Sequence, residues 1–130
     1  TVVTAGARFD GALGRLTNLE GSEDSSDIMD EAPPFMFGKV HLPVNAARPV
    51  QAVATESASF VLMEDGAVYG WGTFRNAQGI IGFSPTVEKQ LTPALVYRPR
   101  GRRTPPVVRL AAGKNHIVAI LQVSPVFCFD

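Results

Sequence analysis

The sequence has almost no cysteine: among its 130 residues, only Cys128 carries a thiol. One cysteine cannot build an internal disulfide framework or a cysteine-based zinc site, which fits a reducing compartment such as the nucleus or the cytoplasm. Long apolar runs and an apolar leader are also missing, so we expect no membrane partner and no export. Lysine plus arginine equals aspartate plus glutamate, 12 against 12, so no bulk charge draws the whole molecule to nucleic acid.

Motifs for catalysis and for cofactors are absent as well. Ser57 lies beside Glu56, but no Gly-x-Ser-x-Gly elbow surrounds it, which argues against a serine hydrolase. The glycines between residues 72 and 82 are a poor dinucleotide fingerprint, because the pattern predicts no helix after them. His41 and His116 lack the cysteine or second histidine of a metal site. We therefore expect no catalytic residue, no metal and no cofactor.

The segment from Asp65 to Gly82 predicts an antiparallel β-hairpin followed by a projecting tip. It begins with Asp-Gly between two apolar runs, and the glycine supplies the positive φ that a two-residue turn needs. Apolar residues that flank a glycine-rich tip usually face the core, so we assign Trp71, Ile80 and Ile81 to packing. The polar stretch from Phe74 to Gln78 is the candidate binding segment.

The chain repeats itself. Residues 54–62 align with residues 112–120 at an offset of 58, and residues 1–14 match residues 67–82 with a shorter tip at 7–10. Repeats of this size, built from several short strands, are typical of β-propellers, in which each unit is one sheet. The sequence therefore predicts an all-β chain of about two blades.

Alternating apolar positions predict further strands, and prolines mark some of their boundaries. We expect strands at residues 35–43, 49–54 and 59–63, and an edge strand at 93–97 that starts at Pro93. We divide the chain into 1–48, the C-terminal part of one repeat with an acidic loop insertion; 49–106, one complete repeat; and 107–130, the start of the next repeat and a tail. Two blades leave sheet edges uncovered, so we predict that the isolated chain is marginally stable and aggregates.

Two charged stretches allow more than one interpretation. Residues Glu20 to Glu31 hold six acidic and no basic side chains, which is typical of a solvated loop, although a docking tract for a basic partner has the same composition. Arg98 to Arg103 contains four arginines among proline and glycine. We interpret it as an extended loop, with a phosphate-binding or nuclear-localisation patch as the alternative. The tail Gln122 to Asp130 fits no repeat.

The motif Asp-Gly-x-Val-Tyr-x-Trp-Gly at 65–72 and the Gly-x-x-Gly close at 79–82 resemble the repeat of the regulator of chromosome condensation family. Residues 71–82 are similar to that family's third blade, whose longer tip is a β-wedge, and residues 11–15 with 19–23 are similar to the segment just before it. The resemblance covers nearly residues 1–121. It implies a fragment of a seven-bladed β-propeller that acts as a guanine-nucleotide exchange factor for the small GTPase Ran and docks on chromatin.

The same resemblance implies which residues face the GTPase. The wedge is Phe74 to Ile81, and its GTPase-binding residues are Phe74, Arg75, Asn76, Ala77, Gln78 and Gly79. The supporting residues on the same face are Glu56, Asn115 and His116.

This chain departs from the family pattern at the supporting positions. Of two acidic family positions, Glu56 keeps the charge and Asn115 loses it. The glycine and histidine that usually accompany the first are Thr55 and Ala58 here, whereas the next repeat retains Gly113 and His116.

An exchange factor performs no covalent chemistry, because it acts by binding the nucleotide-free GTPase more tightly than the loaded one. Two other functions stay open. One is a propeller that serves as a protein-interaction scaffold without exchange activity, and the other is nucleic-acid binding through Arg98 to Arg103. Chromatin docking through parts outside these residues is a further expectation, and the nucleus is the expected compartment, with the cytoplasm second.

Overall fold

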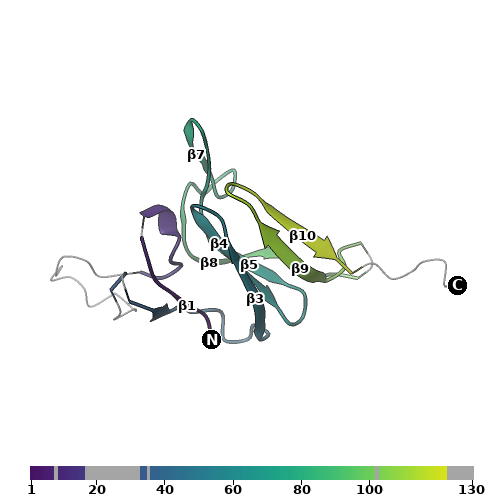
Figure 1. Cartoon of the computed structure of the whole chain (residues 1–130). Coiled ribbons are helices and arrows are strands. Elements are labelled where there is room, and N and C mark those ends of the chain that lie inside the picture. Colours follow the sequence, from purple (N-terminus) through teal and green to yellow (C-terminus); the bar gives the residue numbers. More distant parts are fainter. Residues whose placement is uncertain (8, 17–32, 35, 102, 123–130) are drawn as a thin grey trace, which may run out of the picture.

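A computed structural model describes residues 1–7, 9–16, 33, 34, 36–101 and 103–122 (Figure 1). Apart from one short 3-10 turn, the regular elements of this part of the chain are strands, so the predicted all-β class is confirmed. The elements are β1 Val3–Thr4, η1 Phe9–Gly11, β2 Gly38–Lys39, β3 Pro49–Ala54, β4 Ala58–Met63, β5 Val68–Gly72, β6 Phe74–Asn76, β7 Gly79–Gly82, β8 Gln90–Tyr97, β9 Val107–Ala112 and β10 Ile117–Leu121.

The centre of the fold is a four-stranded antiparallel sheet in the order β3-β4-β5-β8. Its middle pair, β4 and β5, has Phe60 opposite Gly70 and Val61 opposite Tyr69. The turn between them forms at the predicted Asp-Gly site, where Gly66 has a φ of 88° and the Asp65 carboxylate accepts the Ala67 N–H at 3.1 Å. The predicted hairpin is therefore confirmed.

Two predicted strand boundaries are wrong. The edge strand β8 starts at Gln90, so Pro93 lies inside it; an edge strand with register shifts tolerates proline, since no ladder bond needs the missing N–H. The strand expected at 35–43 shrinks to β2, a two-residue strand that pairs with β1. One reason is that the Met36 carbonyl accepts a hydrogen bond from the Arg15 guanidinium at 2.9 Å and is not free for a ladder.

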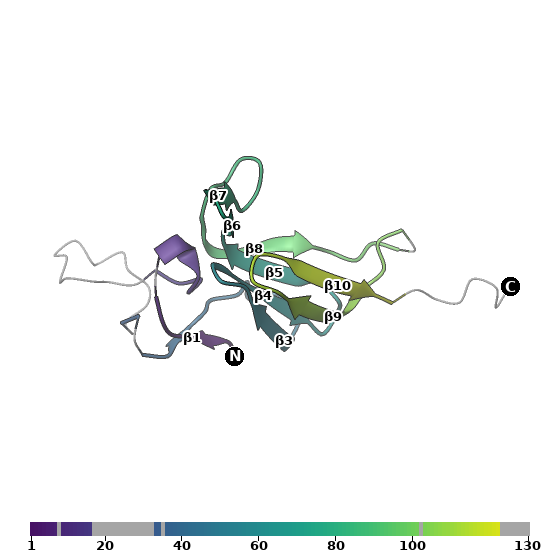
Figure 2. The ribbon, with the colours of Figure 1, turned by 45° about the horizontal axis from the view of Figure 1, so that its top comes forward.

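The middle strands β4 and β5 of the central sheet are buried on both faces, as in a blade between two neighbours, whereas the outer strands β3 and β8 are partly exposed. In Figure 2 the β9–β10 hairpin lies beside the central sheet, and the N-terminal segment that contains β1 lies near one end of that sheet. Alternate residues of β4 and β5 enter two separate cores. The first contains Val40, Val61, Met63, Ala67, Tyr69 and Trp71, and the second contains Ala58, Phe60, Leu62, Val68, Val107 and Leu110.

The β9–β10 hairpin is also joined to the central sheet by one side chain. The Gln51 amide donates to the Leu110 carbonyl and accepts from the Leu110 N–H, both at 2.8 Å, and so imitates a strand partner. This pair of hydrogen bonds fixes how the β9–β10 hairpin is aligned with the central sheet.

Several predictions concern residues outside the described part of the chain. The acidic stretch Glu20 to Glu31, Arg102 and the tail residues 123–130 belong there. Among the described residues, no helix is long and apolar enough to cross a membrane. In the same part of the chain, no three histidine, cysteine, aspartate or glutamate side chains gather into a metal-binding group.

Candidate functional site

A second, smaller hairpin projects from the central sheet (Figures 1 and 2). We call the segment Phe74–Gly82, formed by β6 and β7, the wedge hairpin. Arg75 pairs with Ile80 and Asn76 with Gly79, so Ala77 and Gln78 form the tip. The Asn76 carbonyl oxygen Oδ1 accepts the Gln78 N–H at 2.9 Å, and Gly79 has a φ of 124°. The three residues 76–78 are exposed, which leaves the tip accessible to a partner.

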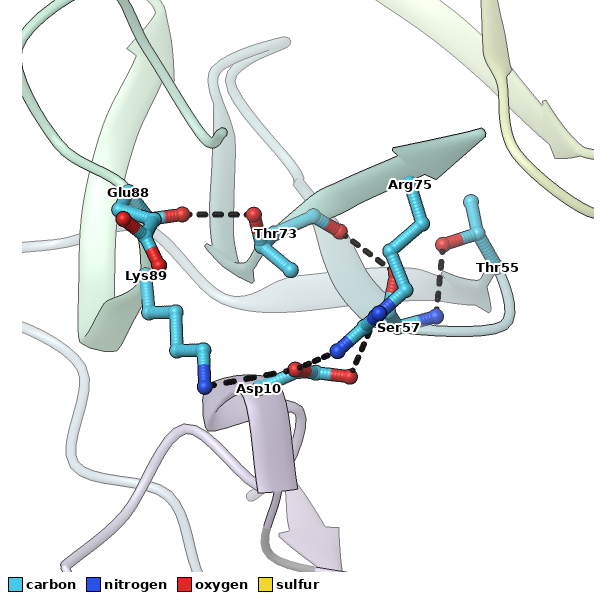
Figure 3. Close-up of polar contacts among 7 residues, drawn as sticks. All are labelled: Asp10, Thr55, Ser57, Thr73, Arg75, Glu88 and Lys89. Carbon is cyan, nitrogen blue, oxygen red and sulfur yellow. Dashed lines mark hydrogen bonds and ion pairs between the residues drawn. The ribbon is translucent and has the colours of Figure 1, made fainter. Parts of the chain in front are cut away.

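The base of the wedge hairpin is anchored by buried and partly buried hydrogen bonds (Figure 3). Thr73 is 0% exposed. Its carbonyl accepts the Ser57 hydroxyl at 2.8 Å, its N–H donates to the Ser57 carbonyl at 3.0 Å, and its own hydroxyl donates to the Glu88 carbonyl at 2.6 Å. These bonds tie the start of the hairpin to two other segments, so the base is held in place while residues 76–78 of the tip are exposed.

The apolar residues in and next to the wedge hairpin do not all have the roles that the sequence predicted. Phe74, predicted to bind the GTPase, is half-buried, and its ring stacks on Phe60 at 5.7 Å and on Phe83 at 6.5 Å. Trp71 is buried as predicted, and its indole N–H donates to the Ala12 carbonyl at 2.9 Å. The packing role predicted for Ile81 is wrong, because Ile81 is 63% exposed, whereas the neighbouring Ile80 is half-buried.

Arg75 makes the strongest polar contact of the wedge hairpin. Its Nε donates to Asp10 Oδ2 at 2.9 Å and its Nη2 to Asp10 Oδ1 at 2.7 Å, and Lys89 Nζ lies 3.6 Å from the same carboxylate (Figure 3). The hydrogen bond from Arg75 lowers the pKa of Asp10, and the Asp10 carboxylate in turn raises the pKa of Arg75.

Sequence reasoning missed Asp10 and Lys89 as residues of this site. The available signal was the alignment of residues 7–10 with the wedge tip, which places Asp10 in the corresponding tip of the preceding copy. Residues that share a position in successive repeats lie at the same end of neighbouring sheets, so proximity followed from the repeat.

Two of the predicted supporting residues lie at the base of the wedge hairpin. In the amide orientation that satisfies both of its polar atoms, Asn115 donates to the carbonyls of Arg75 at 3.2 Å and Lys114 at 3.0 Å. The Glu56 N–H donates to the Lys114 carbonyl at 2.9 Å, and the Glu56 carboxylate lies 3.8 Å from Lys114 Nζ. The structure therefore brings Glu56, Asn115 and Arg75 together.

His116, the third supporting residue, has a local role in the structure. The His116 carbonyl accepts the Gly113 N–H at 2.9 Å, and its imidazole covers Gly113 so closely that no Cβ fits there. In the preceding repeat the same turn is closed by the Thr55 N–H, which donates to the Ala58 carbonyl at 2.8 Å.

The hydroxyl of Thr55 compensates for the missing glycine and histidine. It accepts the N–H groups of Ala58 at 3.0 Å and Ser57 at 3.3 Å. This is how short polar side chains commonly stabilise a turn. The departure from the family pattern at Thr55 and Ala58 thus preserves the turn.

Comparisons with known proteins find a family model and relatives that are similar to this chain. A family model described as the regulator of chromosome condensation (RCC1) repeat matches residues 65–120. The regulator of chromosome condensation of Mus musculus is 35% identical over 119 residues, which cover 92% of this chain and 24% of that protein. The guanine nucleotide exchange factor SRM1 of Saccharomyces cerevisiae is 35% identical over 135 aligned positions, 92% of this chain and 27% of that protein.

Solved structures show the same relation. The crystal structure of Prp20p from Saccharomyces cerevisiae, described together with its binding properties to Gsp1p and histones, matches with a TM-score of 0.66 and 30% identity. The match covers 90% of this chain and 25% of Prp20p. This chain therefore spans about a quarter of the length of the relatives it matches.

Proposed function

Because this chain belongs to the regulator of chromosome condensation family and forms part of a β-propeller of that family, we propose that it acts in guanine-nucleotide exchange on the small GTPase Ran. The observation that carries the proposal is the wedge hairpin, an exposed polar tip on a buried and hydrogen-bonded base. SRM1, the relative that is named as a guanine nucleotide exchange factor, supports the same assignment.

The mechanism requires no covalent chemistry. An exchange factor must bind the nucleotide-free GTPase more tightly than the loaded one, and by linkage it then weakens nucleotide binding by the same factor. A tip that presents the side chains of Asn76 and Gln78 can compete for hydrogen bonds at the nucleotide site. A rigid base helps, because an ordered tip loses little conformational freedom when it binds.

The test is the release of fluorescently labelled GDP from Ran, measured with and without the protein. We expect acceleration by the wild type and at least a tenfold loss in the variant Asn76→Ala/Gln78→Ala, which corresponds to about 1.4 kcal/mol of lost interaction. Asn45→Ala is the matched control, since Asn45 is an exposed residue of a turn away from the wedge hairpin. Release at the spontaneous rate with the wild type would reject the proposal.

A scaffold without exchange activity is the second candidate function. It is favoured by Asn115, whose amide is engaged within the chain and carries no charge to offer a GTPase. Ran binding without faster GDP release in the same assay would select it.

Nuclear localisation and chromatin docking complete the proposal. They are supported by the chromosome-condensation relatives and by the histone binding described for Prp20p. We place chromatin docking outside these 130 residues.

A further inference from the structure

The wedge hairpin is held at Arg75 from two sides, and the two contacts come from different repeats. The Arg75 side chain binds Asp10, which lies in the short tip that aligns with the wedge tip itself. The Arg75 carbonyl accepts the amide of Asn115, which lies in the following repeat. No other residue of the wedge hairpin has both its side chain and its main chain bound in this way by neighbouring repeats in the described part of the chain.

The contact with Asp10 is built for rigidity. A bidentate guanidinium–carboxylate pair fixes direction as well as distance, because two parallel hydrogen bonds remove the freedom to swivel. The Asp10 side chain is only 14% exposed, compared with 35% for Arg75, so the pair is partly shielded from water. Asp10 itself has a φ of 67°, and Gly11 next to it packs against the Gln90 carbonyl, which seats the short tip on the start of β8.

The contact with Asn115 explains why an amide can replace a carboxylate there. An amide nitrogen donates to the carbonyls of Arg75 and Lys114, whereas a carboxylate has only acceptor atoms and would be repelled by both. Asparagine at 115 thus turns inward onto the hairpin.

We propose that Asp10 and Asn115 are positioning residues that brace the wedge hairpin from the two neighbouring repeats and so fix the direction in which its tip projects. The consequence for nucleotide exchange rests on the proposed function, but the brace itself is a statement about this chain and is testable without a GTPase. In this arrangement Arg75 supports the tip and residues 76–78 meet the partner.

The first experiment measures amide hydrogen exchange of residues 74–82 in the wild type, Asp10→Asn, Arg75→Gln and the double variant. Asparagine tolerates the positive φ at residue 10, so Asp10→Asn removes the charge and keeps the backbone. We expect each single variant to accelerate exchange in the hairpin about tenfold and the double variant to exchange no faster than Asp10→Asn alone, because both changes break the same Asp10–Arg75 pair. Unchanged exchange in Asp10→Asn, or additive effects, would overturn the brace.

Asn115→Asp tests the other side. The brace predicts faster hydrogen exchange at residues 74–82, because the aspartate cannot donate to the Arg75 carbonyl. Asn45→Asp is the matched control for the gain of one negative charge, since Asn45 is an exposed residue of a turn away from the wedge hairpin. An Asn115→Asp variant that exchanges no faster than this control contradicts the role of Asn115.

GDP release from Ran separates the brace from the proposed function. Equal losses of activity in Asp10→Asn and Arg75→Gln support positioning through the pair, and a much larger loss in Arg75→Gln overturns it. A wild type without exchange activity rejects the proposed function alone, because the hydrogen-exchange result still decides the brace.

Discussion

The stacked ring of Phe74 allows a test of which wedge residues are structural. We consider Phe74→Leu, which keeps an apolar side chain but removes the ring that stacks on Phe60 and Phe83. Each aromatic pair contributes about 0.5–1.5 kcal/mol beyond area burial, so the loss of two pairs should lower the free energy of unfolding by about 1–3 kcal/mol. Phe37→Leu is the matched control, because Phe37 is 74% exposed and should change stability by less than about 0.5 kcal/mol.

The assay is urea unfolding of the two variants, followed by GDP release from Ran at a temperature and urea concentration where both are folded. If Phe74 acts by packing, Phe74→Leu unfolds at lower urea than the control yet retains exchange activity when folded. The reasoning fails if both variants unfold at the same urea concentration, or if Phe74→Leu loses exchange activity with its stability intact. The second outcome would return Phe74 to the GTPase-binding set that the sequence suggested.

Three further predictions concern charge and backbone. The pKa of Asp10 is lowered by its hydrogen bond from Arg75, so its contribution to stability is present above the pKa of an unfolded aspartate and is lost as the pH falls through the lower folded pKa. Asp10→Asn should therefore reduce stability at pH 6 and much less at pH 2.5, in thermal melts at the two pH values; an equal reduction at both contradicts it. Gly72→Ala should cost about 1–3 kcal/mol more than Gly6→Ala in urea unfolding, because both glycines have similar positive φ (101° and 126°) but only at Gly72 would the added Cβ clash with the Ser57 carbonyl. Finally, replacing Arg98, Arg100 and Arg103 with glutamine should leave the salt dependence of DNA binding unchanged, as for a simple loop, whereas a slope lower by up to about 2.7 would show three phosphate contacts.

The sequence predicted the central sheet well because its signals are local. The Asp-Gly turn at 65–66 and the alternation in residues 49–54 and 59–63 state directly where strands pair and which faces are buried. These strands occur where expected, with boundaries that differ by at most one residue. The repeat then indicated a propeller, because a sheet that is apolar on both faces needs neighbours on both sides.

The sequence predicted that the wedge hairpin is present, but it predicted less well which of the hairpin's side chains are buried. The polar interruption after Gly72 predicts a projecting tip, and the hairpin is there. Which of its side chains pack depends on residues far away in sequence: Phe74 stacks on Phe83 and Phe60, and Ile81 faces outward. A linear pattern does not contain these contacts, so the packing assignment for Ile81 was wrong.

The pair between Asp10 and Arg75 shows what a sequence hides even when the repeat is recognised. The two residues are far apart along the chain, and neither differs in the sequence from the charged residues that usually lie on a protein surface. They meet because the short tip of one repeat and the long tip of the next occupy corresponding positions on adjacent sheets. In this chain, the shorter tip places the Asp10 carboxylate where it contacts Arg75 of the longer tip.

Departures from the family pattern at 55, 58 and 115 acquire a physical interpretation through the same contacts. Thr55 closes its turn with a hydroxyl where the next repeat uses Gly113 and His116, so the geometry under Glu56 is kept. Asn115 gives up a charge but gains a donor to the Arg75 carbonyl. In the proposed exchange mechanism, the hydrogen bond from Asn115 to the Arg75 carbonyl should offset part of the GTPase binding that a charge at residue 115 would contribute. The effect of Asn115→Asp on GDP release measures whether the restored charge or the lost hydrogen bond to the Arg75 carbonyl matters more.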